Sequence, residues 1–220
     1  MKWPSINEIR VFTPLPEGYA WDLLSPAEIA TAIEFFNTWL PSITVGSAKS
    51  FLDPGFYVKD VLGSDRSNTP FLVVVVRHAG EIVAIAAWEK VDGPDIIFGR
   101  LGAVSAAHRH SNLAVAAQEL GTQMGQQMGA GLIYGIATTH APYMQRALER
   151  AGYIASGILP GFDREELQPS VIRRVFEVMY VKRLAPHEDF LTPSRVNLTP
   201  AVARLYDEIF SQDPSFLPPP

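Results

Sequence analysis

Residues 96–114, IIFGRLGAVSAAHRHSNLA, join an apolar strand to a helix through a short basic turn. The apolar part of this run contains no proline but carries Gly99 and Gly102, which weaken a strand unless a bulge or a close neighbour requires them. We expect a helix from Leu113, so its first backbone N–H groups lie beside histidine and arginine side chains. A helix N-terminus of this kind favours an anion, usually a phosphate.

Strands are predicted on both sides of this segment. The runs 71–77 and 82–91 are rich in β-forming residues, and the turn between them has Gly80 to supply a positive φ. Together with 96–104 they make an antiparallel meander. An apolar run at 132–138 follows the helix. A helix between two apolar strands predicts a parallel pair with a right-handed crossover.

Two further helices have start and stop signals. The sequence SPAE at 25–28 provides an N-cap, a first-turn proline and a capping-box carboxylate for a helix that Pro41 ends. We expect Thr139 or His140 to cap another helix, which Gly152 stops.

The remaining segments are assigned from local pattern. We expect a short strand at 8–12, a strand at 153–158, a turn-rich loop and then a long antiparallel strand at 171–184. An amphipathic tail helix starts at 199–200. The predicted fold is α/β (α+β), with a mixed, mostly antiparallel sheet of about six or seven strands flanked by helices.

Three aromatic residues lie in the irregular segment before the meander, namely Phe51, Phe56 and Tyr57. Residues of this kind are usually buried, so we expect them to form local core. The alternative is the wall of a ligand pocket.

Composition limits the classes of function. The chain has 220 residues, 47% of them hydrophobic, which is enough for one sizeable core. A net charge of -5 argues against a nucleic-acid-binding surface. The absence of cysteine excludes thiolate chemistry, and no histidine pair has metal-ligand spacing on a predicted helix, so we expect no metal. The longest apolar run, 71–76, is too short to span a bilayer, so we expect a soluble cytoplasmic protein.

The domain organisation follows from the same pattern. Proline concentrates toward both ends of the chain. We expect an N-terminal arm at 1–18, one α/β domain at 19–184, and a C-terminal extension at 185–220 with one helix.

The order of these elements resembles the GNAT superfamily of acyl-CoA-dependent N-acyltransferases. The basic turn also resembles the acyl-CoA signature of that superfamily, V-x-P-x-x-[QR]-x-x-G-x-[GA]. The matching positions are Val104, Ala106 in place of proline, Arg109, Asn112 in place of the first glycine, and Ala114. Asparagine is tolerable there because it visits left-handed conformations at little cost.

The next helix resembles its superfamily counterpart in part. The run AxxxAGY at 147–153 is similar to a helix that ends in Gly-Phe. In the superfamily a tyrosine four residues before that pair often protonates the departing CoA thiolate, but Leu148 stands here. Ala141 stands where an asparagine is frequent. The sequence therefore supports cofactor binding better than any particular catalytic acid.

The resemblance implies transfer of an acetyl group from acetyl-CoA to a small-molecule amine by direct attack. The CoA pyrophosphate would bind backbone N–H groups of the turn, and pantetheine would enter between two splayed strands. A backbone N–H near Ala103 or Val104 would polarise the thioester carbonyl. The residues expected at the pyrophosphate are Arg109, His110, Ser111, Asn112, Leu113 and Ala114. The alternative is an ordinary strand-to-helix turn with solvated basic side chains.

Proton transfer in such a reaction needs a base for the amine and an acid for the thiolate. Glu89, near the end of a predicted strand, is the candidate base, and Tyr143 and His140 are candidate acids. The alternatives are an exposed carboxylate for Glu89, a packed aromatic ring for Tyr143 and a helix cap for His140.

Two other functions stay open from the sequence. The missing tyrosine and asparagine would also suit a domain that binds acyl-CoA as a sensor or scaffold without turnover. Gly99 and Gly102 leave room that would suit a longer acyl donor. The last strand and the tail helix offer apolar surface for a homodimer.

Overall fold

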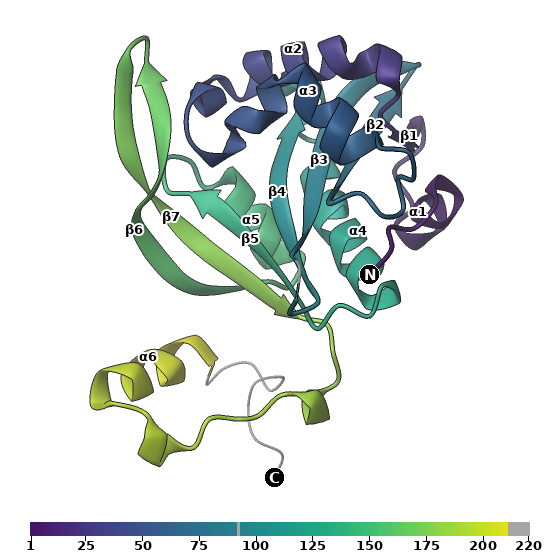
Figure 1. Ribbon diagram of the computed structural model, residues 1–220. Helices are drawn as coiled ribbons and strands as arrows, with labels where there is room; N and C mark the ends of the chain where they lie inside the picture. Colours follow the sequence, from purple (N-terminus) through teal and green to yellow (C-terminus); the bar gives the residue numbers. More distant parts are fainter. Residues whose placement is uncertain (92, 211–220) are drawn as a thin grey trace.

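A seven-stranded sheet with the order β1-β2-β3-β4-β5-β7-β6 organises the computed structural model, which describes residues 1–91 and 93–210 (Figure 1). The pairing is antiparallel except between β4 and β5, as the sequence predicts. The strands are β1 (Tyr19–Leu23), β2 (Phe71–His78), β3 (Glu81–Val91), β4 (Ile96–Val104), β5 (Leu132–Thr138), β6 (Ile154–Gln168) and β7 (Val171–Arg183).

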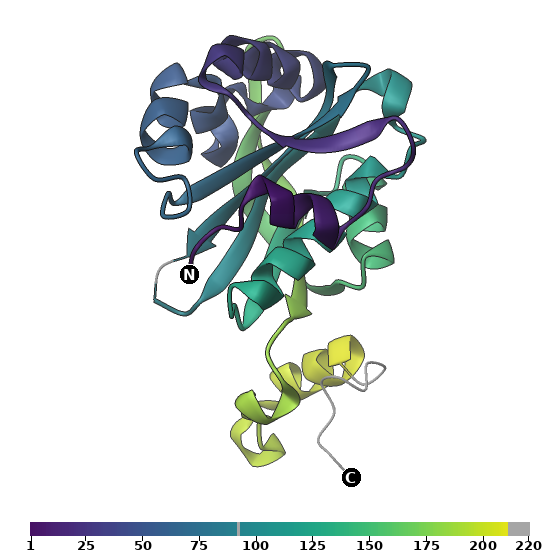
Figure 2. The ribbon, with the colours of Figure 1, turned by 90° about the vertical axis from the view of Figure 1, so that its right-hand side faces the viewer.

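Helices cover both faces of the sheet (Figures 1 and 2). On one face lie α1 (Ile6–Phe12), α4 (Leu113–Gln127) and α5 (Tyr143–Arg150). On the other lie α2 (Ile29–Trp39), α3 (Pro54–Phe56) and a 3₁₀ helix, Ser47–Leu52. The predicted mixed sheet flanked by helices is confirmed.

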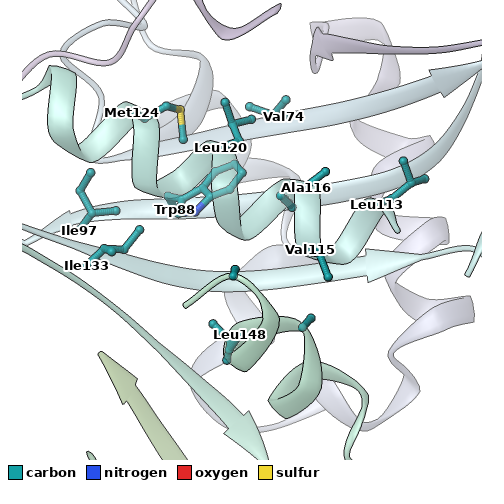
Figure 3. Close-up of a cluster of buried hydrophobic side chains, with 14 of the residues drawn as sticks. Val74, Trp88, Ile97, Leu113, Val115, Ala116, Leu120, Met124, Ile133 and Leu148 are labelled. Atoms are coloured by element: carbon teal, nitrogen blue, oxygen red, sulfur yellow. The ribbon is translucent and has the colours of Figure 1, made fainter. Parts of the chain in front are cut away.

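The core under α4 centres on Trp88 of β3, which is almost fully buried between the helix and the sheet (Figure 3). Leu120 and Met124 of α4 and Ile133 of β5 belong to the same cluster. The helix approaches the sheet closely because Gly121 has no side chain. A Cβ atom there would lie 2.6 Å from Trp88 Nε1.

The second core lies beneath α2 and α3. Phe51 and Tyr57 are fully buried and Phe56 is nearly so. The Tyr57 hydroxyl donates to the carbonyl of Phe51 at 2.9 Å. The prediction that these aromatics form local core is confirmed.

The N-terminal segment differs from its prediction. Residues 8–12, expected as a strand, belong to helix α1, which opens with a Ser5–Glu8 capping box. Ile9 is fully buried, and the Trp3 indole donates to the Thr69 carbonyl at 2.8 Å. The short apolar run therefore follows a helical period, fixed by its cap and by packing on α4.

Two boundaries in the second half also differ. The turn-rich segment after residue 158 continues β6 to Gln168, and register shifts between Leu159 and Asp163 absorb Pro160 and Gly161. Helix α5 starts at Tyr143 with Pro142 as its N-cap, so Thr139 and His140 do not cap it. Figure 1 shows the resulting β6–β7 hairpin projecting at the upper left.

The C-terminal extension contains α6 (Pro200–Phe210), which contacts β6 but buries none of its residues. Residues 211–220 of the predicted extension lie outside the described residues. Within residues 1–91 and 93–210, no helix has both the length and the apolar character needed to cross a membrane. The homodimer stays a prediction.

The close approach of α4 to β3 gives a stability test. Alanine is about 1 kcal/mol better than glycine inside a helix, but overpacking a core costs about 1–3 kcal/mol. At Gly121 the obstacle is the rigid Trp88 ring, so Gly121→Ala should lower the free energy of unfolding by about 1–2 kcal/mol in urea denaturation. At Gly125, on the same helix, the obstacle is a terminal methyl of Leu184, which can rotate away. Gly125→Ala should therefore leave stability nearly unchanged, and equal losses at the two sites would contradict this account.

Candidate functional site

The parallel pairing of β4 with β5 stops halfway along both strands. It covers 96–99 against 132–135 and ends at the pair Gly99–Gly135. A bulge at Arg100 lies directly beyond, because consecutive residues of β3 pair with residues 99 and 101. The two strands separate there and expose backbone groups that a continuous sheet would pair.

A small cavity occupies the point of separation, and both faces of the sheet line it. From the α4 and α5 side it is lined by Trp88, Gly102, Gln118, Met144 and Leu148. From the opposite side it is lined by Ala87, Leu101 and Ile136. The cavity therefore lies within the sheet, at the point where β4 and β5 separate.

Strand alternation decides which amides of β4 face this opening. The N–H of Ser105 donates to the Val83 carbonyl of β3 at 2.9 Å. Backbone groups alternate in direction along a strand, so Ala103 also faces β3, whereas Gly102 and Val104 face the opening. In agreement, the Val104 carbonyl is free of β3 and accepts from Arg109 Nε at 3.4 Å. The geometry favours Gly102 and Val104, rather than Ala103, as donors to a ligand.

The turn after β4 leads into the N-terminus of α4. Asn112 adopts the left-handed conformation, with φ of 59°, which confirms that asparagine is accepted where the signature has glycine. The helix begins at Leu113, and the Ala116 N–H bonds to the Asn112 carbonyl. The N–H groups of Leu113, Ala114 and Val115 precede Ala116, the first N–H that donates within the helix, and they point out of the helix end.

This turn is fastened to the edge strand β1. The Tyr19 hydroxyl lies 2.8 Å from His108 Nδ1 and 2.8 Å from Ser111 Oγ. The rings of Tyr19 and His78 are 4.7 Å apart, and those of His78 and His108 are 5.1 Å apart. One phenol thus fixes two residues of the turn.

The basic side chains Arg109 and His110 of the turn are both exposed, and Arg109 also contacts an aromatic ring. The Arg109 guanidinium lies 5.5 Å from the centre of the Trp39 ring at the end of α2. It is exposed, as is His110. Both lie at the open end of α4, where a bound anion would meet them.

The face opposite α4 carries ionisable groups around Phe98. The Tyr134 ring stacks on Phe98 at 4.4 Å and 10°. The Arg100 guanidinium lies 4.7 Å from the same ring, and Arg100 Nε is 3.4 Å from Glu89 Oε2. Glu89 pairs with Phe98 across the strands, one position before the separation. The sequence placed Glu89 in this region but did not single out Tyr134.

The other two candidate catalytic residues lie between the end of β5 and the first residue of α5. Tyr143 is 75% exposed at the start of α5, and His140 Nδ1 is 3.3 Å from Glu165 Oε2 on β6. Like Glu89, neither is among the described residues that line the cavity. The roles of Tyr143 and His140 stay predictions.

The segment after α2 closes over this face by bonding to β6. The N–H and hydroxyl of Ser47 donate to the Asp163 carboxylate, the hydroxyl at 2.6 Å. Arg100 donates to the Ser47 carbonyl at 3.0 Å. Gly46 makes this contact possible, since a side chain there would collide with Asp163 and the Arg164 carbonyl. These bonds therefore cover the opening between β4 and β5 on the side of Arg100.

Glu177 of β7 is a half-buried carboxyl on the same face, paired with Thr138 at the end of β5. Burial, together with the charges of Asp163 and Glu165, raises the pKa of Glu177 to about 7. Sequence patterns carry no signal for Glu177, because the charges that act on it come from a segment expected to be a loop. No group of three or more potential metal ligands occurs among residues 1–91 and 93–210.

The raised pKa of Glu177 predicts a pH-dependent cost to stability. Between pH 4.5 and about 7 the folded protein keeps a proton that the unfolded chain has lost, so stability falls as pH rises through this window. After allowance for solvent screening, Glu177→Gln should stabilise the protein by about 1 kcal/mol at about pH 8 and by nothing at about pH 4. Urea denaturation at both pH values measures the effect.

Glu166 provides a control, because its substitution should change stability in the opposite direction. Hydrogen bonds from the Thr44 hydroxyl and the Ser170 N–H lower its pKa. Glu166→Gln should therefore lose stability at about pH 8. A gain from Glu177→Gln that persists at low pH would show that charge is not its cause.

The chain matches no protein-family model and no curated protein, but it resembles many solved structures. A spermidine/spermine N-acetyltransferase from Vibrio cholerae has a TM-score of 0.61 at 11% identity, covering 77% of this chain and 95% of that one. A ribosomal-protein-alanine N-acetyltransferase from Escherichia coli has a TM-score of 0.58 at 13% identity, covering 82% and 99%. A proposed acetyltransferase from Salmonella typhimurium, solved with acetyl-CoA, has a TM-score of 0.57 at 14% identity, covering 81% and 99%. The chain therefore has the GNAT fold.

Proposed function

We propose that this protein is an N-acetyltransferase that moves the acetyl group of acetyl-CoA to the amine of a small molecule by direct attack. The observation that carries the proposal is the opening between β4 and β5, which runs from the cavity at Gly99 and Gly135 toward the N-terminus of α4. An extended acyl-pantetheine arm can bond to the unpaired strand edges, and its nucleotide diphosphate then reaches the free amides of the helix.

The residues of the turn suit a diphosphate. In the proposal, N–H groups from Arg109 to Ala114 bind the phosphate oxygens, and the helix dipole adds to the attraction. The exposed Arg109 side chain can add a charge-assisted hydrogen bond. The amide of Gly102, which faces the opening and is nearer to Glu89 along β4 than Val104 is, polarises the thioester carbonyl, as an oxyanion donor needs only a fixed N–H, and the amide of Val104 bonds to the pantetheine arm.

Glu89 is the proposed base for the amine. It lies at the point of strand separation, on the face opposite α4, so an amine that enters from that face meets the carboxylate and the thioester together. The ion pair with Arg100 holds the carboxylate in place. The contact between Ser47 and Asp163 covers part of the opening on this face and so narrows access to Glu89. A narrow entrance favours a small acceptor over a folded protein surface.

A second function stays open because of one observation. Leu148, at the position where the superfamily often has its acid, is buried against Gly135. A protein that binds acyl-CoA without turnover would have the same opening and no acid. The two functions differ in whether bound acetyl-CoA releases its thiol.

Calorimetry with CoA and thiol release from acetyl-CoA together test the proposal. We expect CoA binding, and thiol release that depends on a small amine from a panel of polyamines, amino acids and aminoglycosides. Binding without release for every amine and peptide would favour the sensor. No heat with CoA would contradict both functions.

The contact between β1 and the turn predicts a selective effect on the nucleotide end of the donor. Tyr19→Phe removes the bonds to His108 and Ser111 but keeps the ring. Loss of about 1 kcal/mol of binding free energy at the nucleotide end should raise KM for acetyl-CoA about 5-fold, with kcat nearly unchanged. Acetyl-pantetheine lacks the diphosphate, so its kcat/KM should not change.

Tyr180→Phe is the matched control, since that hydroxyl bonds to Glu149 at 2.8 Å, on the outer helix α5. It should leave both donors unaffected. An equal loss with acetyl-pantetheine in Tyr19→Phe would mean that the bonds support the fold rather than the phosphate site.

A further inference from the structure

Tyr134 lies at the mouth of the opening between β4 and β5. It pairs with Phe98, one position before the last pair, Gly99 with Gly135. Its strand neighbour Ile133 is buried in the core under α4. Side chains alternate along a strand, so Tyr134 projects from the opposite face, which is the face of the proposed base.

The ring of Tyr134 is held while its hydroxyl is free. The ring lies flat on Phe98, and the Arg100 guanidinium sits over the same Phe98 ring and beside Glu89. Tyr134, Arg100 and Glu89 therefore surround one aromatic residue at the end of the paired strands. Within the described residues the Tyr134 hydroxyl has no hydrogen-bond partner, so it can donate to a ligand.

The environment keeps this phenol protonated. Burial raises the pKa of Tyr134, and the charge of Glu89 raises it further, against an opposing effect of Arg100. A tyrosine in this setting carries its proton at neutral pH and is available as a donor.

Helix α5 presents no proton donor where the pairing of β4 with β5 ends. Leu148 packs against Gly135, with its Cδ2 3.4 Å from where a Cβ atom would stand, and Tyr143 is 75% exposed. The departing sulfur would thus meet an apolar side chain from the helix and a phenol from the strand.

We propose that Tyr134 is the catalytic residue that protonates the departing thiolate. The proposal rests on the proposed acetyltransferase function. In this proposal the acid lies on strand β5 beside Glu89, rather than on the helix where the superfamily often has it.

Glu89 and Tyr134 together account for both protons that move in this step. The neutral amine attacks the thioester carbon, so the N–C bond forms and the C–S bond breaks. The nitrogen gives one proton to Glu89, and Tyr134 gives its proton to the sulfur. The proton on Glu89 then returns to the tyrosinate, which leaves the amide, the free thiol and both residues in their starting states.

The test is Tyr134→Phe, which keeps the ring on Phe98 and removes only the hydroxyl. We expect kcat with acetyl-CoA to fall about 100-fold or more, with KM for acetyl-CoA changed by about 2-fold at most. A variant that keeps most of the wild-type kcat overturns the proposal. Tyr180→Phe serves as the control for loss of a hydroxyl elsewhere in the sheet.

A change of leaving group separates catalysis from structure. With p-nitrophenyl acetate the leaving phenolate needs no proton, so the loss in Tyr134→Phe should shrink to a few-fold, whereas the loss in Glu89→Gln should persist. An equal loss with both donors overturns the assignment. If the wild type does not accept this ester, the alkaline limb of kcat against pH decides: its disappearance in Tyr134→Phe supports the proposal, and its retention overturns it.

Failure of the proposed function is a distinct result. Wild-type protein that binds no CoA, or that binds it without thiol release, removes the reaction itself. Wild-type turnover with an unimpaired Tyr134→Phe variant removes only the assignment of Tyr134.

Discussion

The end of hydrogen bonding between β4 and β5 is the constraint on which the rest of the structure depends. A parallel sheet normally pairs along its whole length, because each unpaired amide in the interior costs free energy. Here the pairing ends at Gly99 and Gly135, and the bulge at Arg100 turns β4 away from its partner. The chain keeps an opening in the middle of its sheet, where a ligand backbone can replace the missing strand contacts.

Such an opening weakens the sheet at its centre, so neighbouring elements have to hold the two halves of the sheet together. On one face α4 packs directly on Trp88 and Ile133 through Gly121, which joins β3 to β5 across the gap. On the other face the bonds from Ser47 to Asp163 and from Arg100 to Ser47 join β4 to the β6–β7 hairpin. The residues that keep the halves together are also those that limit access to the opening.

The parts of the fold that local pattern determines were predictable from the sequence. The meander, the parallel crossover and α4 follow from strand composition, a turn glycine and a helix start, and Asn112 adopts the left-handed conformation that its residue type permits. The strand expected at 8–12 was wrong because Ser5 and Glu8 form a capping box that fixes a helix. The extent of β6 was missed because bulges absorb Pro160 and Gly161, and sequence alone does not show which turn residues a hairpin will tolerate.

The candidate site was predictable only where it lies in one segment. The turn and the helix end are consecutive in sequence, whereas Tyr134 meets Glu89 only through the register of β3, β4 and β5. The bulge at Arg100 follows the end of the pairing between β4 and β5. Shifting β4 by one residue against β5 would turn Phe98 away from Tyr134 and toward the core under α4. A phenol on β5 can therefore take the place of a phenol on α5 only while the register that pairs Tyr134 with Phe98 is kept, and no local pattern in the sequence indicates that register.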